Sequence, residues 1–268
     1  MAMNMNSVTN EHIDRPTLQW NERLHYRDRL RSARYAALAD AEGFSEICFA
    51  IEALGLRLLG QKAEMGSYMD KVSDLARDSL VLSDLWRSFP GYFTRFDALY
   101  ETVRIARNDA MHTGVYARHA TSAAIELCIG LEEALMRAQQ IQRLSVADFM
   151  VKSAVVVESW QPVAHARQLM LTHSFSFLPV QLGGWKLLSE ISLAKFLSGV
   201  RSKKKLLATT IEAASNDGLA LIDARVVAPE ALTSELLAGV DIDHGPALWL
   251  VLDEQARLTG VLSPFELM

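Results

Sequence analysis

The sequence predicts a two-domain protein, with an all-α helical bundle in the N-terminal half and an α/β unit in the C-terminal half. Apolar residues recur at helical spacing from Pro16 to about Gln142, where β-branched runs are almost absent. After Leu144, short β-branched strands alternate with short helices, and this order occurs twice. A chain of 268 residues is long enough for two modest domains.

The first half is expected to contain a disordered tail over residues 1–15 and a helical bundle over 16–142. Pro16 suits the first turn of the first helix, which reaches Gly43. Glycine and proline residues then separate the later helices. We expect those helices over residues 44–62, 67–89, 93–109 and 116–142.

The second half, residues 143–268, is predicted to hold two β-α-β-β-α copies, at about 144–200 and 218–268. In the first copy, strands are expected over 155–157, 177–181 and 185–191, with helices over 162–172 and 192–199. In the second copy, strands are expected over 226–227, 247–252 and 258–262, with a helix over 229–239 and a last helix that opens at Pro264.

Composition and charge exclude several classes of protein. The net charge of −5 is spread over both halves, so neither half is a basic module that binds nucleic acid by charge alone. No apolar run approaches the roughly 20 residues of a membrane helix, and no signal pattern opens the chain. Two cysteines are too few for a disulfide framework. We therefore expect a cytoplasmic protein without a membrane partner.

Three strings give the second half a resemblance to a tandem CBS domain pair. The first copy has 145-SVADFM-150 and 177-FLPV-180, and the second ends in 260-GVLSPFEL-267. The last string matches the closing signature of that family, a glycine, then a hydroxyl residue three positions on, then a carboxylate three further on.

The resemblance implies adenine nucleosides or nucleotides, such as AMP or ATP, as ligands, with no other cofactor. Ser263 would cap a helix whose N-terminus favours phosphate, and Glu266 would accept the ribose hydroxyls. Apolar strand residues would contact the base, namely Val226, Val227 and Leu248.

In the first copy the signature is 189-SEISLAK-195, with Ser192 as the hydroxyl residue and a lysine in place of the carboxylate. We therefore infer at most one well-formed ribose site, while Lys195 could instead contact a phosphate. The alternative is a degenerate CBS pair that serves only dimerisation. The cluster of Arg201 and Lys203–Lys205 fits a solvated linker, or else a phosphate or RNA contact.

In the helical half, the string 107-RNDAMHTG-114 resembles the Arg-x4–6-His motif of HEPN domains, many of which are metal-independent ribonucleases. His112 would transfer protons near neutral pH, and Arg107 would hold phosphate oxygens. Asn108 or Asp109 would orient the histidine or single-stranded RNA as the substrate.

Five positions place Arg107 and His112 on different faces of an uninterrupted helix. They can converge only if the helix breaks before Thr113 or if two copies meet, so the resemblance implies a homodimer. In the alternative interpretation, Arg107 pairs with Asp97 or Asp109, and His112 caps a helix.

Together these observations predict an adenine-nucleotide-sensing protein whose CBS pair controls a dimeric HEPN-like ribonuclease. Two alternatives stay open. In the first, the helical half is a dimerisation or partner-docking module without catalysis; in the second, it binds RNA without cleaving it.

Overall fold

The computed structural model describes residues 18–40, 43–113, 118–137, 144–198, 203–239 and 248–268, with no side chains described over 110–118. The chain divides into two compact units, Met1–Ile141 and Gln142–Met268. The tail expected over residues 1–15 lies outside the described residues.

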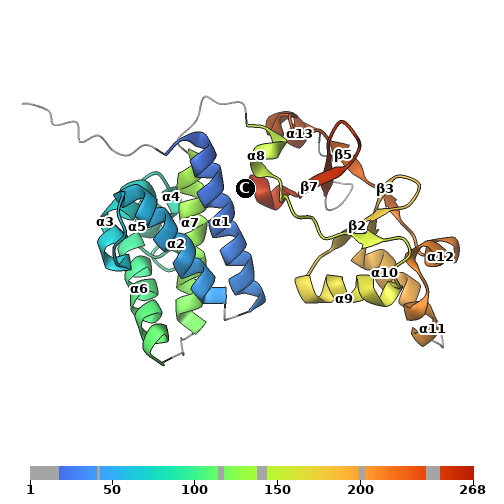
Figure 1. Cartoon of the computed structure of the whole chain (residues 1–268), viewed down its shortest axis with the longest axis horizontal. Helices are drawn as coiled ribbons and strands as arrows, with labels where there is room; N and C mark the ends of the chain where they lie inside the picture. The colour runs from blue at the N-terminus through green and yellow to red at the C-terminus, as the bar shows by residue number, and fades with distance from the viewer. Residues whose placement is uncertain (1–17, 41–42, 114–117, 138–143, 199–202, 240–247) are drawn as a thin grey trace, which may run out of the picture. The chain divides into compact units, whose positions relative to one another are not determined.

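The first unit is a helical bundle (Figure 1). Helix α1 packs against α7 and α2, α2 also packs against α3, and α6 packs against α7. Their apolar faces form one core in which the residues at the centre have no exposed surface, among them Leu30, Ile47, Ile51, Leu54, Leu127 and Leu131. The long helices are α1 (Trp20–Ala39), α2 (Phe44–Leu59), α3 (Met65–Ala76), α6 (Phe96–Thr113) and α7 (Arg118–Arg137).

The single helix expected over residues 67–89 is wrong, because the chain breaks there into α3, α4 (Leu80–Ser83) and α5 (Leu85–Ser88). Ser79 begins α4 as an N-cap, with its side chain accepting a hydrogen bond from the backbone N–H of Leu82. The Ser79 hydroxyl also donates to Glu133 on α7, at 2.6 Å. This capped break lets a short helix turn onto α7, which a straight helix could not do.

The second unit begins with a four-stranded sheet of order β1-β2-β3-β4. Strands β1 (Val157–Glu158) and β2 (Phe177–Gln181) are parallel, joined by α9 (Val163–His173). Strand β3 (Trp185–Ser189) returns antiparallel to β2 and leads into α10 (Glu190–Leu197).

A three-stranded sheet of order β5-β6-β7 repeats this plan. Strand β5 is parallel to β6 and β6 is antiparallel to β7. The helix between β5 and β6 is α13 (Thr233–Ala238), and a 3-10 turn, η3 (Pro264–Leu267), follows β7 where the first copy has α10. The strands are β5 (Arg225–Val227), β6 (Trp249–Leu252) and β7 (Leu258–Leu262).

The two copies exchange short helices. Helix α8 (Val146–Phe149) precedes the first copy but packs in the core of the second, where Val146 has no exposed surface beside Trp249. Helix α12 (Ile211–Asn216) precedes the second copy but packs in the core of the first, through Ile211 and Ala214. Each copy therefore completes its core with a segment that precedes the other copy in the sequence.

The backbone contacts repeat the same exchange. Ser145, the N-cap of α8, bridges Leu232, the N-cap of α13, while Thr210, the N-cap of α12, bridges Pro162, the N-cap of α9. At the sheet edges, Val151 bridges β7, and β4 (Ile222–Asp223) pairs with β3. These matched contacts give the unit an internal two-fold pattern.

The exchanged elements α8, α12 and β4 were not predicted, and neither was α11 (Lys203–Ala208), which stands where a solvated linker was expected. Lys203, Lys204 and Lys205 are exposed on α11. None of the described helices is both long enough and apolar enough to cross a membrane.

Candidate functional site

The turn from β7 into η3 holds the two polar residues predicted to bind a nucleotide. The backbone N–H of Ser263 donates to Oε2 of Glu266 at 2.8 Å, and the Ser263 hydroxyl donates to the same oxygen at 2.6 Å. The Ser263 oxygen in turn accepts from the N–H of Phe265 at 3.3 Å. Serine and glutamate are thus joined in a capping box at the helix start.

The apolar residues predicted to contact the base lie in the same sheet. Leu248 precedes β6, next to Trp249, and Trp249 pairs with Leu262, the residue before Ser263. Leu248 and Ser263 therefore lie at the same end of the sheet. Val226 is 54% exposed, whereas Val227 is buried in the core. Of these two valines, Val226 is therefore the one that presents surface to a ligand.

On the sequence, the closing signature of the second copy was matched to 189-SEISLAK-195 in the first copy. The pairing of the strands instead matches Gly260 with Lys186, three residues earlier. Gly260 pairs with Val251 in β6, and Lys186 pairs with Val180 at the matching place in the first sheet. Ser189, the last residue of β3, and Ser263, the first residue after β7, are accordingly the matching N-caps.

Ser192, rather than Lys195, therefore stands where the second copy has Glu266. The hydroxyls of Ser189 and Ser192 are 2.8 Å apart, so a hydroxyl replaces the carboxylate in the first copy's cap. Lys195 lies exposed in the last turn of α10, at the other end of that helix.

Packing explains the glycine of the second signature. A Cβ at Gly260 would lie 2.9 Å from Sδ of Met150 and 2.9 Å from the carbonyl oxygen of Val151. These atoms belong to the segment that crosses from the first copy onto β7. Gly260 thus permits the exchange between the copies.

In the helical unit, α6 continues without a break from Phe96 to Thr113. Arg107 and the backbone of His112 therefore belong to one continuous helix, and the helix break that could bring them together within one chain does not occur. The side chain of His112 lies outside the described residues. Asn108 is half-buried and Asp109 is exposed.

Arg107 forms an ion pair with Glu52 on α2 rather than with Asp97 as one alternative expected. Its Nη2 lies 2.8 Å from Oε1 of Glu52, with 32% and 24% of the two side chains exposed. Asp97 instead pairs with Arg95 at 2.6 Å. The Arg107–Glu52 pair joins α6 to α2, and no local pattern predicts it, because the two residues lie on separate helices.

One carboxylate oxygen of Glu52 is shielded from solvent. Its Oε1 is buried and accepts no hydrogen bond from the described residues, so it contacts Arg107 through charge rather than through an aligned N–H. Burial, together with the Glu52 carboxylate, raises the pKa of the Cys48 thiol to about 12. The same two causes raise the pKa of Tyr100, whose hydroxyl donates to the carbonyl of Met65 at 2.7 Å.

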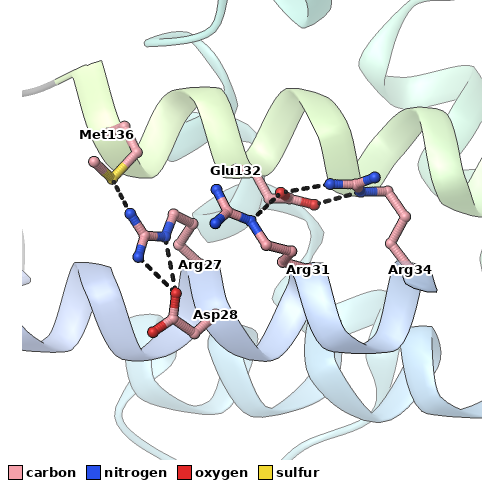
Figure 2. Close-up of polar contacts among 6 residues, drawn as sticks. All are labelled: Arg27, Asp28, Arg31, Arg34, Glu132 and Met136. Atoms are coloured by element: carbon pink, nitrogen blue, oxygen red, sulfur yellow. Dashed lines mark hydrogen bonds and ion pairs between the residues drawn. The ribbon is translucent and has the colours of Figure 1, made fainter. Parts of the chain in front are cut away.

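A second charged cluster, which we call the arginine seam, joins α1 to α7: Arg23, Arg27, Arg31 and Arg34 (Figure 2 shows the last three). Nη1 of Arg23 donates to two carbonyls near the end of α7, at 3.1 and 3.3 Å. Arg27, only 1% exposed, donates to Asp28 and to the sulfur of Met136.

Glu132 on α7 is the acid that the other two arginines of the seam share. It accepts two hydrogen bonds from Arg34, at 2.8 and 3.0 Å, and lies 3.5 Å from Arg31. The four arginines recur every three or four positions, which places them on one face of α1. This spacing is a signal in the sequence from which the seam could have been predicted.

The described residues contain no group of three or more His, Cys, Asp or Glu side chains that could hold a metal ion.

Comparison with known proteins gives only weak likenesses. No family model matches the chain, and no curated protein matches it. A CBS domain-containing protein of unknown function from Bacillus anthracis is 20% identical, with a TM-score of 0.39 over 47% of this chain and 91% of that one.

Two further solved structures carry ligands. A CBS domain pair in complex with 5′-methylthioadenosine and S-adenosyl-L-methionine is 13% identical, with a TM-score of 0.35 over 47% of this chain and 94% of that one. The protein CBSX2 in complex with AMP is 19% identical, with a TM-score of 0.36 over 46% and 91%. The chain is thus similar to CBS-domain proteins over about half of its length.

Proposed function

We propose that the second unit is a tandem CBS pair and that it senses adenine nucleotides. The observation that carries this proposal is the internal exchange, in which α8 completes the second β-α-β-β-α copy and α12 completes the first. Because each copy holds part of the other, a ligand bound at one copy can alter the placement of both. That is the property a sensor requires.

The second copy supplies the proposed ribose contact. Glu266 is held at the end of β7 by two hydrogen bonds from Ser263 to its Oε2. A carboxylate at this place would accept the hydroxyls of a ribose, while Val226 and Leu248 offer apolar surface to the base. The first copy, with Ser192 at this position, offers no matching carboxylate.

For the helical unit, the proposal extends to a dimeric, HEPN-like ribonuclease controlled by the nucleotide. Arg107 and His112 lie on one unbroken helix, so a composite site needs two copies of the chain. Arg107 would stabilise the charged phosphorus centre, and His112 would transfer protons to or from the 2′-hydroxyl and the leaving oxygen. Asn108 and Asp109 would orient these groups.

A second candidate is a regulator whose helical unit serves dimerisation or partner docking without catalysis. The ion pair between Arg107 and Glu52 favours it. The nearby carboxylate offsets the positive field of the guanidinium and thus weakens its attraction for a phosphate. The two candidates share the nucleotide sensor and differ only in what the helical unit does.

Calorimetry with AMP and ATP tests the sensor. We expect binding by the wild-type chain and a loss of at least tenfold in affinity in Glu266→Ala. Glu266→Gln keeps an acceptor for the Ser263 cap and separates ligand contact from folding. Glu254→Ala, which removes an exposed carboxylate in the β6–β7 turn, is the matched control. An unchanged affinity in both Glu266 variants would rule out the ribose contact.

A cleavage assay tests the enzyme. Wild type and His112→Ala are incubated with single-stranded RNA in a metal chelator, with and without AMP or ATP. We expect cleavage by wild type alone and a rate that changes with nucleotide. Equal cleavage by both proteins, or none by either, would leave the non-catalytic regulator as the function of the helical unit.

A further inference from the structure

The connection between α5 and α6 is a tight turn with an exposed aromatic residue at each end. Phe89 is 52% exposed and Tyr92 is 85% exposed. The backbone N–H of Tyr92 donates to the carbonyl of Phe89 at 3.0 Å, which closes the turn over Pro90 and Gly91. Proline followed by glycine suits the centre of such a turn, and the turn brings the Cα atoms of Phe89 and Tyr92 close together.

Two guanidinium groups flank this turn in the sequence, and both lie against Trp86. The Cζ atoms of Arg87 and Arg95 are 5.2 and 5.0 Å from the centre of the Trp86 ring. The indole N–H donates to the carbonyl of Ser83 at 3.0 Å, which fixes the orientation of the ring. Cation–π contacts with Trp86 thus orient two guanidinium groups, one on each side of the turn in the sequence.

The acids near these arginines hold them with different strengths. Arg87 lies 3.6 Å from Asp84, whereas Arg95 donates two hydrogen bonds to Asp97, at 2.6 and 3.0 Å. Between 48% and 67% of each of these four side chains is exposed, so water and salt screen both pairs. A phosphate oxygen can replace Asp84 at Arg87 at a cost of about 1 kcal/mol or less, while at Arg95 it must displace a two-point contact.

We infer that residues 86–95, which we call the aromatic turn, bind single-stranded RNA. The rings of Phe89 and Tyr92 stack on successive bases, and Arg87 and Arg95 contact the adjoining phosphates. Exposed rings interleaved with guanidinium groups are the combination by which proteins bind single strands without reading their sequence. The inference rests on the proposed function only in taking RNA as the partner, and it holds whether or not the helical unit cleaves.

In the sequence, Tyr92, Phe93, Phe96 and Tyr100 recur at helical spacing, which favours a place in the core or in a dimer seam for all four. The structure divides this set. Phe96 and Tyr100 are buried in the bundle, whereas Tyr92 stands in solvent ahead of α6. Only the exposed members are available to a strand of RNA.

Fluorescence anisotropy of a labelled 2′-O-methyl oligouridine, added to the full chain in low salt and chelator, tests the inference. This probe lacks the nucleophile for cleavage, so binding is measured independently of any ribonuclease activity. We expect Phe89→Ala combined with Tyr92→Ala to weaken binding at least tenfold. Tyr92→Phe should bind as wild type, because it keeps the ring.

Two controls complete the design. Leu38→Ala removes an exposed apolar side chain on α1 and should leave the affinity unchanged. Arg87→Gln with Arg95→Gln should flatten the dependence of log Kd on log salt by about 0.7 per lost phosphate contact.

Three outcomes would overturn the inference: no binding by wild type, an equal loss in Leu38→Ala, or a loss in Tyr92→Phe as large as in the double alanine variant. Self-association that depends on the same two rings, with no binding of the oligonucleotide, would also overturn it and identify an interface between copies. A catalytically inactive protein that binds the probe through the turn would contradict the ribonuclease and leave this inference standing.

Discussion

The ion pair between Arg107 and Glu52 distinguishes the two proposals for the helical unit. If Arg107 binds RNA phosphate, it must first leave Glu52. We therefore expect Glu52→Gln, which removes the competing charge, to raise the affinity for short RNA several-fold. Binding titrations with the 2′-O-methyl probe measure this change.

The chain offers a matched control on the same helix. Arg104 pairs with Glu101 at 2.5 Å, and Glu101→Gln breaks that pair without touching Arg107. An increase in Glu52→Gln alone would support Arg107 as the phosphate contact. Equal affinities in wild type and Glu52→Gln would mean that Arg107 serves packing between α6 and α2.

Both cysteines are expected to be unreactive in the folded protein. Burial raises the pKa of the Cys48 thiol to about 12 and raises the pKa of Cys128 well above its ordinary value. Because the thiolate is the reactive form, the thiols stay protonated at pH 8. A disulfide-exchange reagent should titrate both cysteines in denaturant and neither in native buffer; a thiol that reacts rapidly in native protein would show that the core opens.

Elements whose pattern and end signals are local could be predicted from the sequence, and elements that depend on distant contacts could not. Strands β2 and β7 begin and end where they were expected, because alternation and turn residues mark both ends. The break at Ser79 depends on Glu133, more than fifty positions away, which no local pattern reports. Helices α8 and α12 bury their apolar faces in the other copy, so their role depends on the exchange.

The candidate sites follow the same division. Ser263 and Glu266 can be proposed from the sequence alone because the whole motif lies within a few residues, and their role in binding stays a prediction. The sequence misplaced their counterparts in the first copy, because only the pairing of Lys186 with Val180 fixes the register. It could not find Glu52, since the contact with Arg107 spans two helices.

The arginine seam depends on one carboxylate at the centre of the α1–α7 interface. Glu132, only 8% exposed, pairs with Arg31 and Arg34, and its hydrogen bond keeps the pKa of Arg34 raised although burial alone would lower it. Replacing Glu132 with glutamine would leave two guanidiniums desolvated without their anion. We expect a loss of about 3 kcal/mol in the free energy of unfolding, measured by urea denaturation.

A compensating variant separates charge from packing at the seam. Arg31→Met and Arg34→Met, combined with Glu132→Leu, replace all three charges by apolar side chains and should recover part of the loss. A triple variant no more stable than Glu132→Gln would mean that geometry, rather than unpaired charge, explains the cost.

Glu22 links the start of α1 to α2 and makes stability depend on pH. Two hydrogen bonds from Arg57, at 2.6 and 2.9 Å, and then one from the backbone N–H of Gln19, hold the pKa of Glu22 below its ordinary value. A carboxyl with a lowered pKa stabilises the fold above its unfolded pKa, and this stabilisation is lost as pH falls through the folded pKa.

Glu22→Gln should accordingly be less stable than wild type at pH 7, by about 1 kcal/mol or less, since both partners are partly exposed. The difference between the two proteins should shrink as pH falls through the folded pKa of Glu22, which lies below its ordinary value. A difference that does not shrink on acidification would show that the glutamine disturbs packing rather than charge.

At the scale of the whole molecule, the two units are built differently. The helical unit places its core between helices that follow one another, with α1 closed against α7 at the end of the unit. The second unit interleaves two copies, so the core of each copy includes a helix from outside its own stretch of sequence. A local change in one copy should therefore be felt in the other.

Hydrogen exchange can detect this interleaving directly. Val146 on α8 and Ile211 on α12 both have no exposed surface. Val146 packs in the core of the second copy, and Ile211 packs in the core of the first. Val146→Ala should speed exchange in β5, β6 and β7, whereas Ile211→Ala should speed it in β1, β2 and β3. The cavities cost roughly 1–3 and 2–5 kcal/mol, enough to raise local opening at least fivefold. Leu171→Ala, on the exposed face of α9, should change neither set. If Val146→Ala instead released the first sheet before the second, the copies would be independent, and the exchange that supports a ligand sensor would not operate in solution.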